Sequence, residues 1–183
     1  IITDVDSGLP ALPAGAASVA QGRFLALMAL GSLRERALDY EAALERYRAA
    51  EAIAPSPAPK VRAFRGLIAT GMFIDPARAL ADADRALAWL ASQPDATKSL
   101  LSQFSTLRGR TLLNLGRFDE SRKELRAGVD ALGGLTLRVD VPDLAARSDM
   151  AIAALLSGYP DEARKYLAYT GAGHQESTFF DGA

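Results

Sequence analysis

A ten-residue segment occurs twice in this chain, first at residues 116–125 and again 42 residues later at 158–167. Six of the ten positions carry the same residue in both copies: a glycine, an Asp-Glu pair, an Arg-Lys pair and a leucine. Self-similarity at such a period is typical of stacked supersecondary units, because a single unit cannot bury its apolar face alone. The repeat therefore predicts a solenoid built from similar units.

Helical patterns separated by short breaks run through most of the sequence. Residues 135–141 differ, since they alternate apolar and polar side chains and fit either a short strand or an extended connection. We expect helices at about 18–36, 40–54, 60–72, 75–92, 95–115, 118–132, 142–156 and 160–169. Short breaks join antiparallel neighbours. The expected fold class is therefore all-α, an α-solenoid of about four antiparallel helix hairpins at 18–54, 60–92, 97–132 and 142–169.

The two ends of the chain lack the helical period. Residues 1–16 hold two prolines and two glycines, which predicts a linker or a strap. Residues 171–183 are glycine-rich and polar before Phe179-Phe180, which predicts a flexible tail. The expected repeat domain is 17–170.

The first hairpin carries a spaced motif. It reads Leu27-x2-Leu30-Gly31-x2-Arg34, then Ala43-x3-Tyr47, then Ala50 and Pro55. This motif resembles the tetratricopeptide repeat, whose pattern is Trp-x2-Leu-Gly-x2-Tyr, then Ala-x3-Phe, then Pro. Small residues at Gly31 and Ala43 would let the two helices approach closely, with Leu27 and Tyr47 filling the gap.

The resemblance is clearest in residues 18–55 and looser in 97–170. The other hairpins repeat the small-residue pairs and place leucine where Tyr47 stands, at Gly66/Ala79, Gly109/Ser121, Ala151/Ala163, Leu125 and Leu167. No repeat has the family's tryptophan, and Arg34 replaces its tyrosine. The spacing between units grows from 35 to 43 and 42 residues.

Composition excludes several classes of function. The formal net charge is −1, whereas nucleic-acid binding needs a surplus of Lys and Arg. The chain has no cysteine, which excludes disulfides, thiolate catalysis and Cys-based zinc sites. The apolar run 24–30 is too short to span a bilayer, so we expect no membrane insertion. The compartment, cytoplasmic or periplasmic, stays open, and the Arg- and Ala-rich bias is typical of a GC-rich bacterial genome.

Residues that could carry catalysis do not converge in the sequence. The single histidine, His174, stands among glycines without an orienting partner. Asp4-x-Asp6 lacks the downstream ligands of a calcium loop. Asp119-Glu120 and Asp161-Glu162 fall in the first turn of a helix, where acids offset the helix dipole. We predict no catalytic residue, no metal, no cofactor and no enzyme activity.

The resemblance implies that the first helix of each hairpin lines a concave groove. Alignment on the small residues predicts a set of mixed apolar, hydrogen-bonding and cationic groups there: Met28, Ser32, Lys60, Leu67, Gln103, Thr106, Arg110, Asn114 and Ser148. Such a set suits an extended peptide whose carboxylate pairs with Lys60 or Arg110. The Arg-Lys pairs at 122–123 and 164–165 predict a small basic stripe on the convex side, most simply a solvated face.

The sequence thus predicts a non-catalytic scaffold that binds a protein or peptide segment in its groove. The alternative is a spacer or self-association domain of a larger protein, such as a bacterial envelope or sensor protein, with a homo-oligomer or an attached domain. The third hypothesis, an enzyme, is the weakest of the three.

Overall fold

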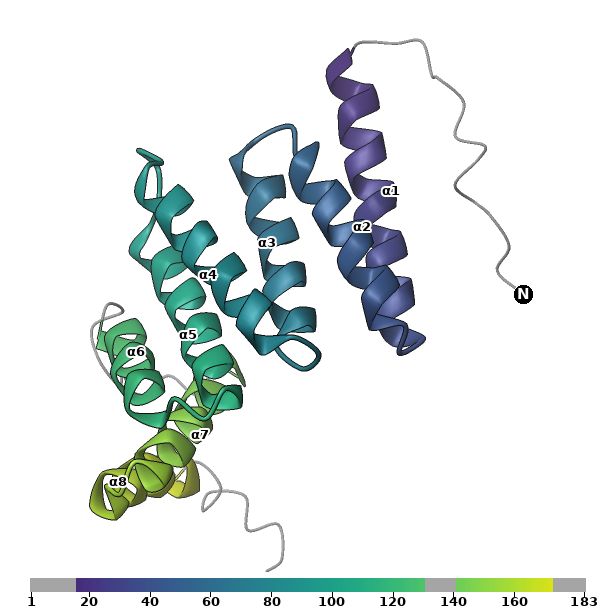
Figure 1. The fold of residues 1–183 in the computed structure, drawn as a ribbon. Helices are drawn as coiled ribbons and strands as arrows, with labels where there is room; N and C mark the ends of the chain where they lie inside the picture. Colours follow the sequence, from purple (N-terminus) through teal and green to yellow (C-terminus); the bar gives the residue numbers. More distant parts are fainter. Residues whose placement is uncertain (1–15, 131–140, 173–183) are drawn as a thin grey trace, which may run out of the picture. The chain divides into compact units, whose positions relative to one another are not determined.

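The computed structural model describes residues 16–130 and 141–172, which form helices joined by short turns (Figure 1). No strand occurs in these ranges. The eight helices are α1 (Ala16–Arg36), α2 (Tyr40–Ala52), α3 (Pro57–Gly71), α4 (Pro76–Ala91), α5 (Lys98–Asn114), α6 (Phe118–Asp130), α7 (Val141–Leu156) and α8 (Pro160–Ala172). The predicted all-α class, with helices in antiparallel pairs, is confirmed.

Side chains at the helix starts set several of these bounds. The carboxylate of Asp75 accepts a hydrogen bond from the backbone N–H of Arg78 at 3.0 Å, ahead of Pro76 in the first turn of α4. Thr97 caps α5 through the N–H of Leu100 at 3.2 Å, so α5 begins later than the expected residue 95. The third helix begins earlier than expected, at Pro57, because prolines are tolerated in a first helical turn.

Several sequence expectations fall outside the described residues. They are residues 1–15 of the strap predicted at 1–16, most of the alternating segment 135–141, and the part of the predicted tail beyond Ala172. Asp4, Asp6, His174 and Phe179-Phe180 lie there as well. Ala16, the last residue of the predicted strap, begins α1 instead. Residues 171 and 172, assigned to the tail from sequence, complete α8 instead.

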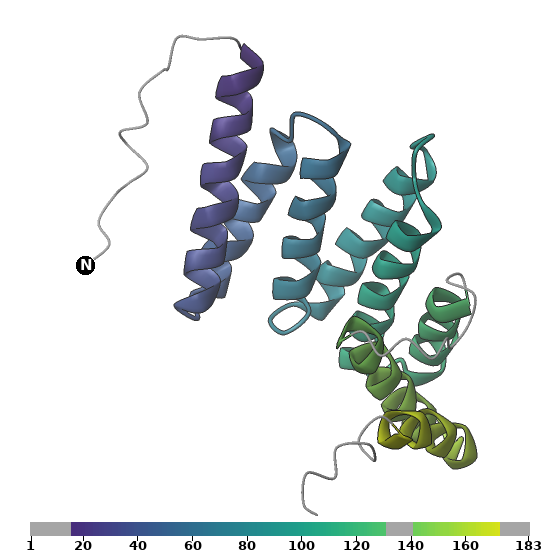
Figure 2. The same cartoon turned by 180° about the vertical axis from the view of Figure 1, so that it is seen from behind.

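Contacts divide the chain into two compact units, and the division falls within α3, between Gly66 and Leu67. In the second unit α4 packs on α5, α5 on α6, α6 on α7 and α7 on α8, and α7 also reaches α5. Figures 1 and 2, which view the molecule from opposite sides, both show α7 and α8 side by side. That residues 17–170 act as one repeat domain stays a prediction.

Tyr47 of α2 forms the centre of the first unit. Its ring is 4% exposed and lies between Gly31 of α1 and Gly66 of α3. A Cβ atom placed on Gly31 would lie 2.6 Å from the ring, and one on Gly66 would lie 2.9 Å from it. The hydroxyl donates to Glu35 at 2.9 Å, and burial, helped by this bond, raises the pKa of Tyr47 far above its usual value. The predicted gap filled by Tyr47 beside Gly31 is confirmed.

The second unit repeats this packing with a leucine in place of the tyrosine. A Cβ atom on Gly109 of α5 would lie 2.6 Å from Cγ of Leu125, which is fully buried. The hydroxyl of Ser121, the small residue predicted opposite Gly109, donates to the Gly109 carbonyl at 2.7 Å. Where such small residues lie in the contact, the two helices approach until the backbone of one touches a side chain of the other.

The glycine that opens each copy of the sequence repeat has a conformational role. Gly116 has φ +73° and Gly158 has φ +84°, in the left-handed region that favours glycine. At both turns the next residue bonds back to the ending helix, Arg117 N–H to Leu112 at 3.0 Å and Tyr159 N–H to Ala154 at 2.8 Å. The repeated glycine therefore ends the first helix of its hairpin and allows the chain to reverse.

Replacing Gly31 with alanine should destabilise the protein by about 1–3 kcal/mol, because the new methyl group would overlap a ring that Gly66 and Glu35 hold in place. Gly22→Ala is the matched control in the same helix, because nothing lies within 4 Å of that position. It should stabilise by about 0.5–1 kcal/mol through helix propensity alone. Urea unfolding of both variants measures the difference, and equal effects would contradict the packing account.

Candidate interaction surface

Four of the predicted groove residues lie along one face of α5. Gln103, Thr106, Arg110 and Asn114 are spaced by three or four positions, which aligns them on a helix. Gln103 and Asn114 are exposed and the other two are half-buried. The Thr106 hydroxyl donates to the carbonyl of Ser102 at 3.0 Å, and the Asn114 amide donates to the carbonyl of Met72 at 2.9 Å. Asn114 therefore joins the end of α5 to the α3–α4 turn and keeps its own carbonyl oxygen for another donor.

Arg110 links this face of α5 to α7. Its Nε donates to Asp149 in an ion pair whose side chains are 32% and 19% exposed. Burial raises the pKa of Asp149 above its usual value, and the bond and charge of Arg110 only partly oppose that shift. Arg110 was predicted to hold a ligand carboxylate, but one of its donors is already occupied by a carboxylate of the chain.

An exposed apolar row continues the surface along α7. Ile152, Leu155 and Leu156 follow the helical spacing of three and four residues on α7, and Tyr159 comes next in the α7–α8 turn; all four are 46–59% exposed. They begin one turn beyond Ser148, the exposed residue of α7 that sequence alignment placed in the groove. We name these four residues the α7 row.

A cleft of about 330 Å³ lies at the end of the α7 row. Its lining comes from the α5–α6 turn, the first turn of α6 and the end of α7: Gly116, Arg117, Phe118, Asp119, Glu120, Leu156 and Ser157. The hydroxyl oxygen of Ser157 is buried and has no hydrogen-bond partner in the part of the chain that the structure describes. The cleft is thus apolar on the α7 side and charged on the α6 side.

The remaining predicted groove residues lie elsewhere. Met28 and Ser32 are half-buried on α1. Lys60 pairs with Glu51 at 3.2 Å and stands 5.8 Å above the ring of Phe64, so its charge already has partners within the first unit. Leu67 is fully buried and offers no surface to a ligand.

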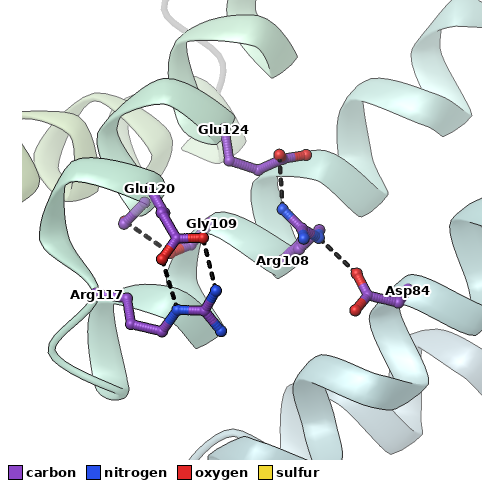
Figure 3. Close-up of polar contacts among 7 residues, drawn as sticks. Asp84, Arg108, Gly109, Arg117, Glu120 and Glu124 are labelled. Carbon is purple, nitrogen blue, oxygen red and sulfur yellow. Dashed lines mark hydrogen bonds and ion pairs between the residues drawn. The ribbon is translucent and has the colours of Figure 1, made fainter.

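Arginine side chains also join neighbouring hairpins away from this surface. Arg108 of α5 donates to Asp84 of α4 at 2.6 Å and to Glu124 of α6 at 2.9 Å (Figure 3). Burial alone would lower the pKa of Arg108, but the two carboxylates outweigh it and raise the pKa above its usual value. A separate pair at the cleft joins Arg117 to Glu120, also drawn in Figure 3.

The expected solvated basic stripe needs a correction at Arg122. Its side chain is 17% exposed, pairs with Glu162 of α8 at 2.8 Å and stacks on the ring of Tyr159 at 4.0 Å. Arg122 therefore joins α6 to the last hairpin. Such contacts matter because a repeat unit is stabilised by its neighbours as well as by its own packing. Lys123, Arg164 and Lys165 are exposed as expected.

The α7 row was missed by sequence reasoning, although a usable signal was present. Ile152, Leu155 and Leu156 stand one, four and five positions after Ala151, and Arg110 and Asn114 stand one and five positions after Gly109. The alignment that selected Ser148 therefore also selects Ile152 and Leu156, and Leu155 lies next to Leu156. They resembled ordinary core residues, because an apolar helix pattern does not distinguish a buried face from an exposed one.

Two kinds of site are absent from the part of the chain that the structure covers. Within 16–130 and 141–172 no group of three or more His, Cys, Asp or Glu side chains is placed to hold a metal ion. No helix in those ranges is long and apolar enough to cross a bilayer.

Comparisons with known proteins add little to this picture. No protein-family model and no curated protein matches the sequence. Among solved structures, the chain is similar to the crystal structure of MamA protein at 15% sequence identity, over 89% of this chain and 98% of that chain, with a TM-score of 0.35. A likeness of this size assigns neither a family nor a function, so the interpretation rests on the chain's own residues.

Replacing Asp149 with asparagine should change how stability depends on pH. A carboxyl whose pKa is raised by folding stabilises the protein below its ordinary pKa, and this contribution is lost as the pH rises through the raised value. The wild type should therefore gain stability relative to Asp149→Asn as the pH falls from about 7 toward about 4. Urea unfolding of both proteins across that range measures the difference, and other carboxyls cancel in the comparison. A constant difference, or one of opposite sign, would contradict the raised pKa.

Proposed function

We propose that this chain is a non-catalytic scaffold of the tetratricopeptide type, which binds a segment of a partner protein along α5 and α7. The observation that carries the proposal is the α7 row. Three large apolar side chains of α7, together with Tyr159 of the following turn, stand in solvent beside the polar face of α5 and a cleft of about 330 Å³. Contiguous exposed apolar surface with a polar border is typical of protein interaction sites.

The two parts of the surface would serve different purposes in binding. Apolar side chains of a partner would cover Ile152, Leu155 and Leu156, with each fully buried side chain contributing about 1.5–3 kcal/mol. The cleft beside Leu156 has room for one such side chain. Burial of this row supplies most of the affinity in the proposal.

The polar face of α5 would orient the bound segment. Arg110 bonds Asp149 through Nε alone, so its terminal N–H groups are available to a backbone carbonyl or a carboxylate of the partner. The side chains of Gln103 and Asn114 are exposed and offer both donors and acceptors. The Arg110–Asp149 pair fixes the direction of the guanidinium before binding, which reduces the entropy lost on association.

Crosslinking, followed by binding measurements on one variant and its matched control, tests the proposal. A photoreactive residue at Leu155 should crosslink a partner in native lysate, and mass spectrometry identifies it. Binding of the purified partner should then weaken at least tenfold in Ile152→Ser/Leu156→Ser, because two apolar contacts are lost. Phe73→Ser is the control, since Phe73 is 76% exposed in the α3–α4 turn and belongs neither to the α7 row nor to the polar side chains of α5.

Three results would contradict the proposal. One is a partner that binds the α7 variant and the wild type equally. Another is a partner lost only in the Phe73 control. The third is the absence of any crosslink from Leu155 under conditions in which the protein is folded.

A further inference from the structure

We propose that the α7 row binds the outer face of α1 in a second copy of this chain, so that copies associate head to tail. This inference rests on the proposed function in one respect, that the α7 row is a binding surface. It adds the identity of the bound segment. The argument starts from where the exposed apolar residues lie.

Large exposed apolar side chains lie in four places among the described residues. They are found on α1 and the turn after it, in the α3–α4 turn at Phe73 and Ile74, around the end of α7, and at Leu167 of α8. Helices pack through rows of side chains, not through isolated turn residues. Rows at helical spacing occur on α1 and on α7.

The outer face of α1 consists of Leu25, Ala29 and Leu33, which are four residues apart and all exposed. Leu25 is 44% exposed and Leu33 is 58% exposed, whereas Phe24 on the inner face is fully buried. Apolar residues at helical spacing normally pack against another element, whereas Leu25 and Leu33 stay exposed.

The charges beside the two rows are of opposite sign. Arg36, three positions after Leu33 on α1, is exposed and forms no ion pair with the described residues. Near the α7 row, Asp119 lines the cleft, is exposed and has no basic partner in the described part of the chain. Complementary charges at the border of an interface select the correct partner and orientation.

The same charges disfavour the symmetric alternatives. Two α1 faces brought together would place arginines against arginines, and two α7 rows would place Asp119 against Asp119. Pairing α1 with α7 avoids both repulsions. Because this contact joins two different surfaces, each copy offers one α1 face and one α7 row, and the copies form a closed ring or an open chain.

Two single variants, each with one altered face, test the inference. Leu33→Glu alters α1 and Leu155→Glu alters the α7 row; both side chains are more than half exposed, so each variant should keep its helicity and melting temperature. Sedimentation velocity of the wild type should show a mass above that of the monomer, and this mass should rise with concentration. Each variant should associate at least tenfold more weakly than the wild type. An equimolar mixture of the two variants should form a dimer and nothing larger, because it retains one intact pair of faces. Phe73→Glu, which alters neither row, should behave as the wild type.

Other outcomes would overturn the inference. They are a wild type that stays monomeric at every concentration, a variant that associates as the wild type does, and a mixture of variants that stays monomeric. These outcomes do not decide the proposed function, which is tested separately. If the wild type is monomeric but Leu155 still crosslinks a different protein, the α7 row remains a binding surface and only its assignment to α1 is wrong.

Discussion

The close approach of helices at small residues is the constraint on which each unit depends. Tyr47 can lie between α1 and α3 only because Gly31 and Gly66 present no Cβ to its ring. Leu125 lies against Gly109 for the same reason in the second unit. Since protein interiors are packed near crystal density, one added methyl group at these positions must move a helix or a ring. The small residues therefore determine the separation of the helices, and the surfaces on their outer sides follow from it.

A second constraint comes from arginine. Arg108 joins α4, α5 and α6, Arg110 joins α5 to α7, and Arg122 joins α6 to α8. Each guanidinium has several donors in a fixed plane, so one side chain can bond two acidic groups or combine an ion pair with ring stacking. The arginine-rich composition thus has a structural use, in fastening successive hairpins of the second unit to one another. These pairs also fix polar side chains around the proposed binding surface before any partner arrives.

The sequence predicted the fold well because the signals for it are local. Glycines at positions 116 and 158, the proline after Asp75 and the twelve-residue spacing of small residues each act within one hairpin. Ion pairs such as Arg110–Asp149 could not be predicted in the same way, because they join residues 39 positions apart and depend on how hairpins stack. Lys60 and Arg110 were correctly recognised as cations on first helices, but their partners Glu51 and Asp149 were not foreseen. The bounds of α3 and α5 were displaced where a proline or a capping threonine outweighed the apolar period.

The exposed rows show why a repeat fold leaves the sequence ambiguous about function. In a solenoid every unit needs an apolar face toward its neighbour, so Leu25, Leu33, Ile152 and Leu155 have the pattern of core residues whether or not a neighbour covers them. Only the structure shows that, among the described residues, these side chains lie in solvent. The same physical requirement that stacks one hairpin on the next then favours covering these rows with another helix. A helix from a second copy would satisfy that requirement with the kinds of interaction that join the hairpins of the second unit, apolar packing bordered by arginine and acidic side chains.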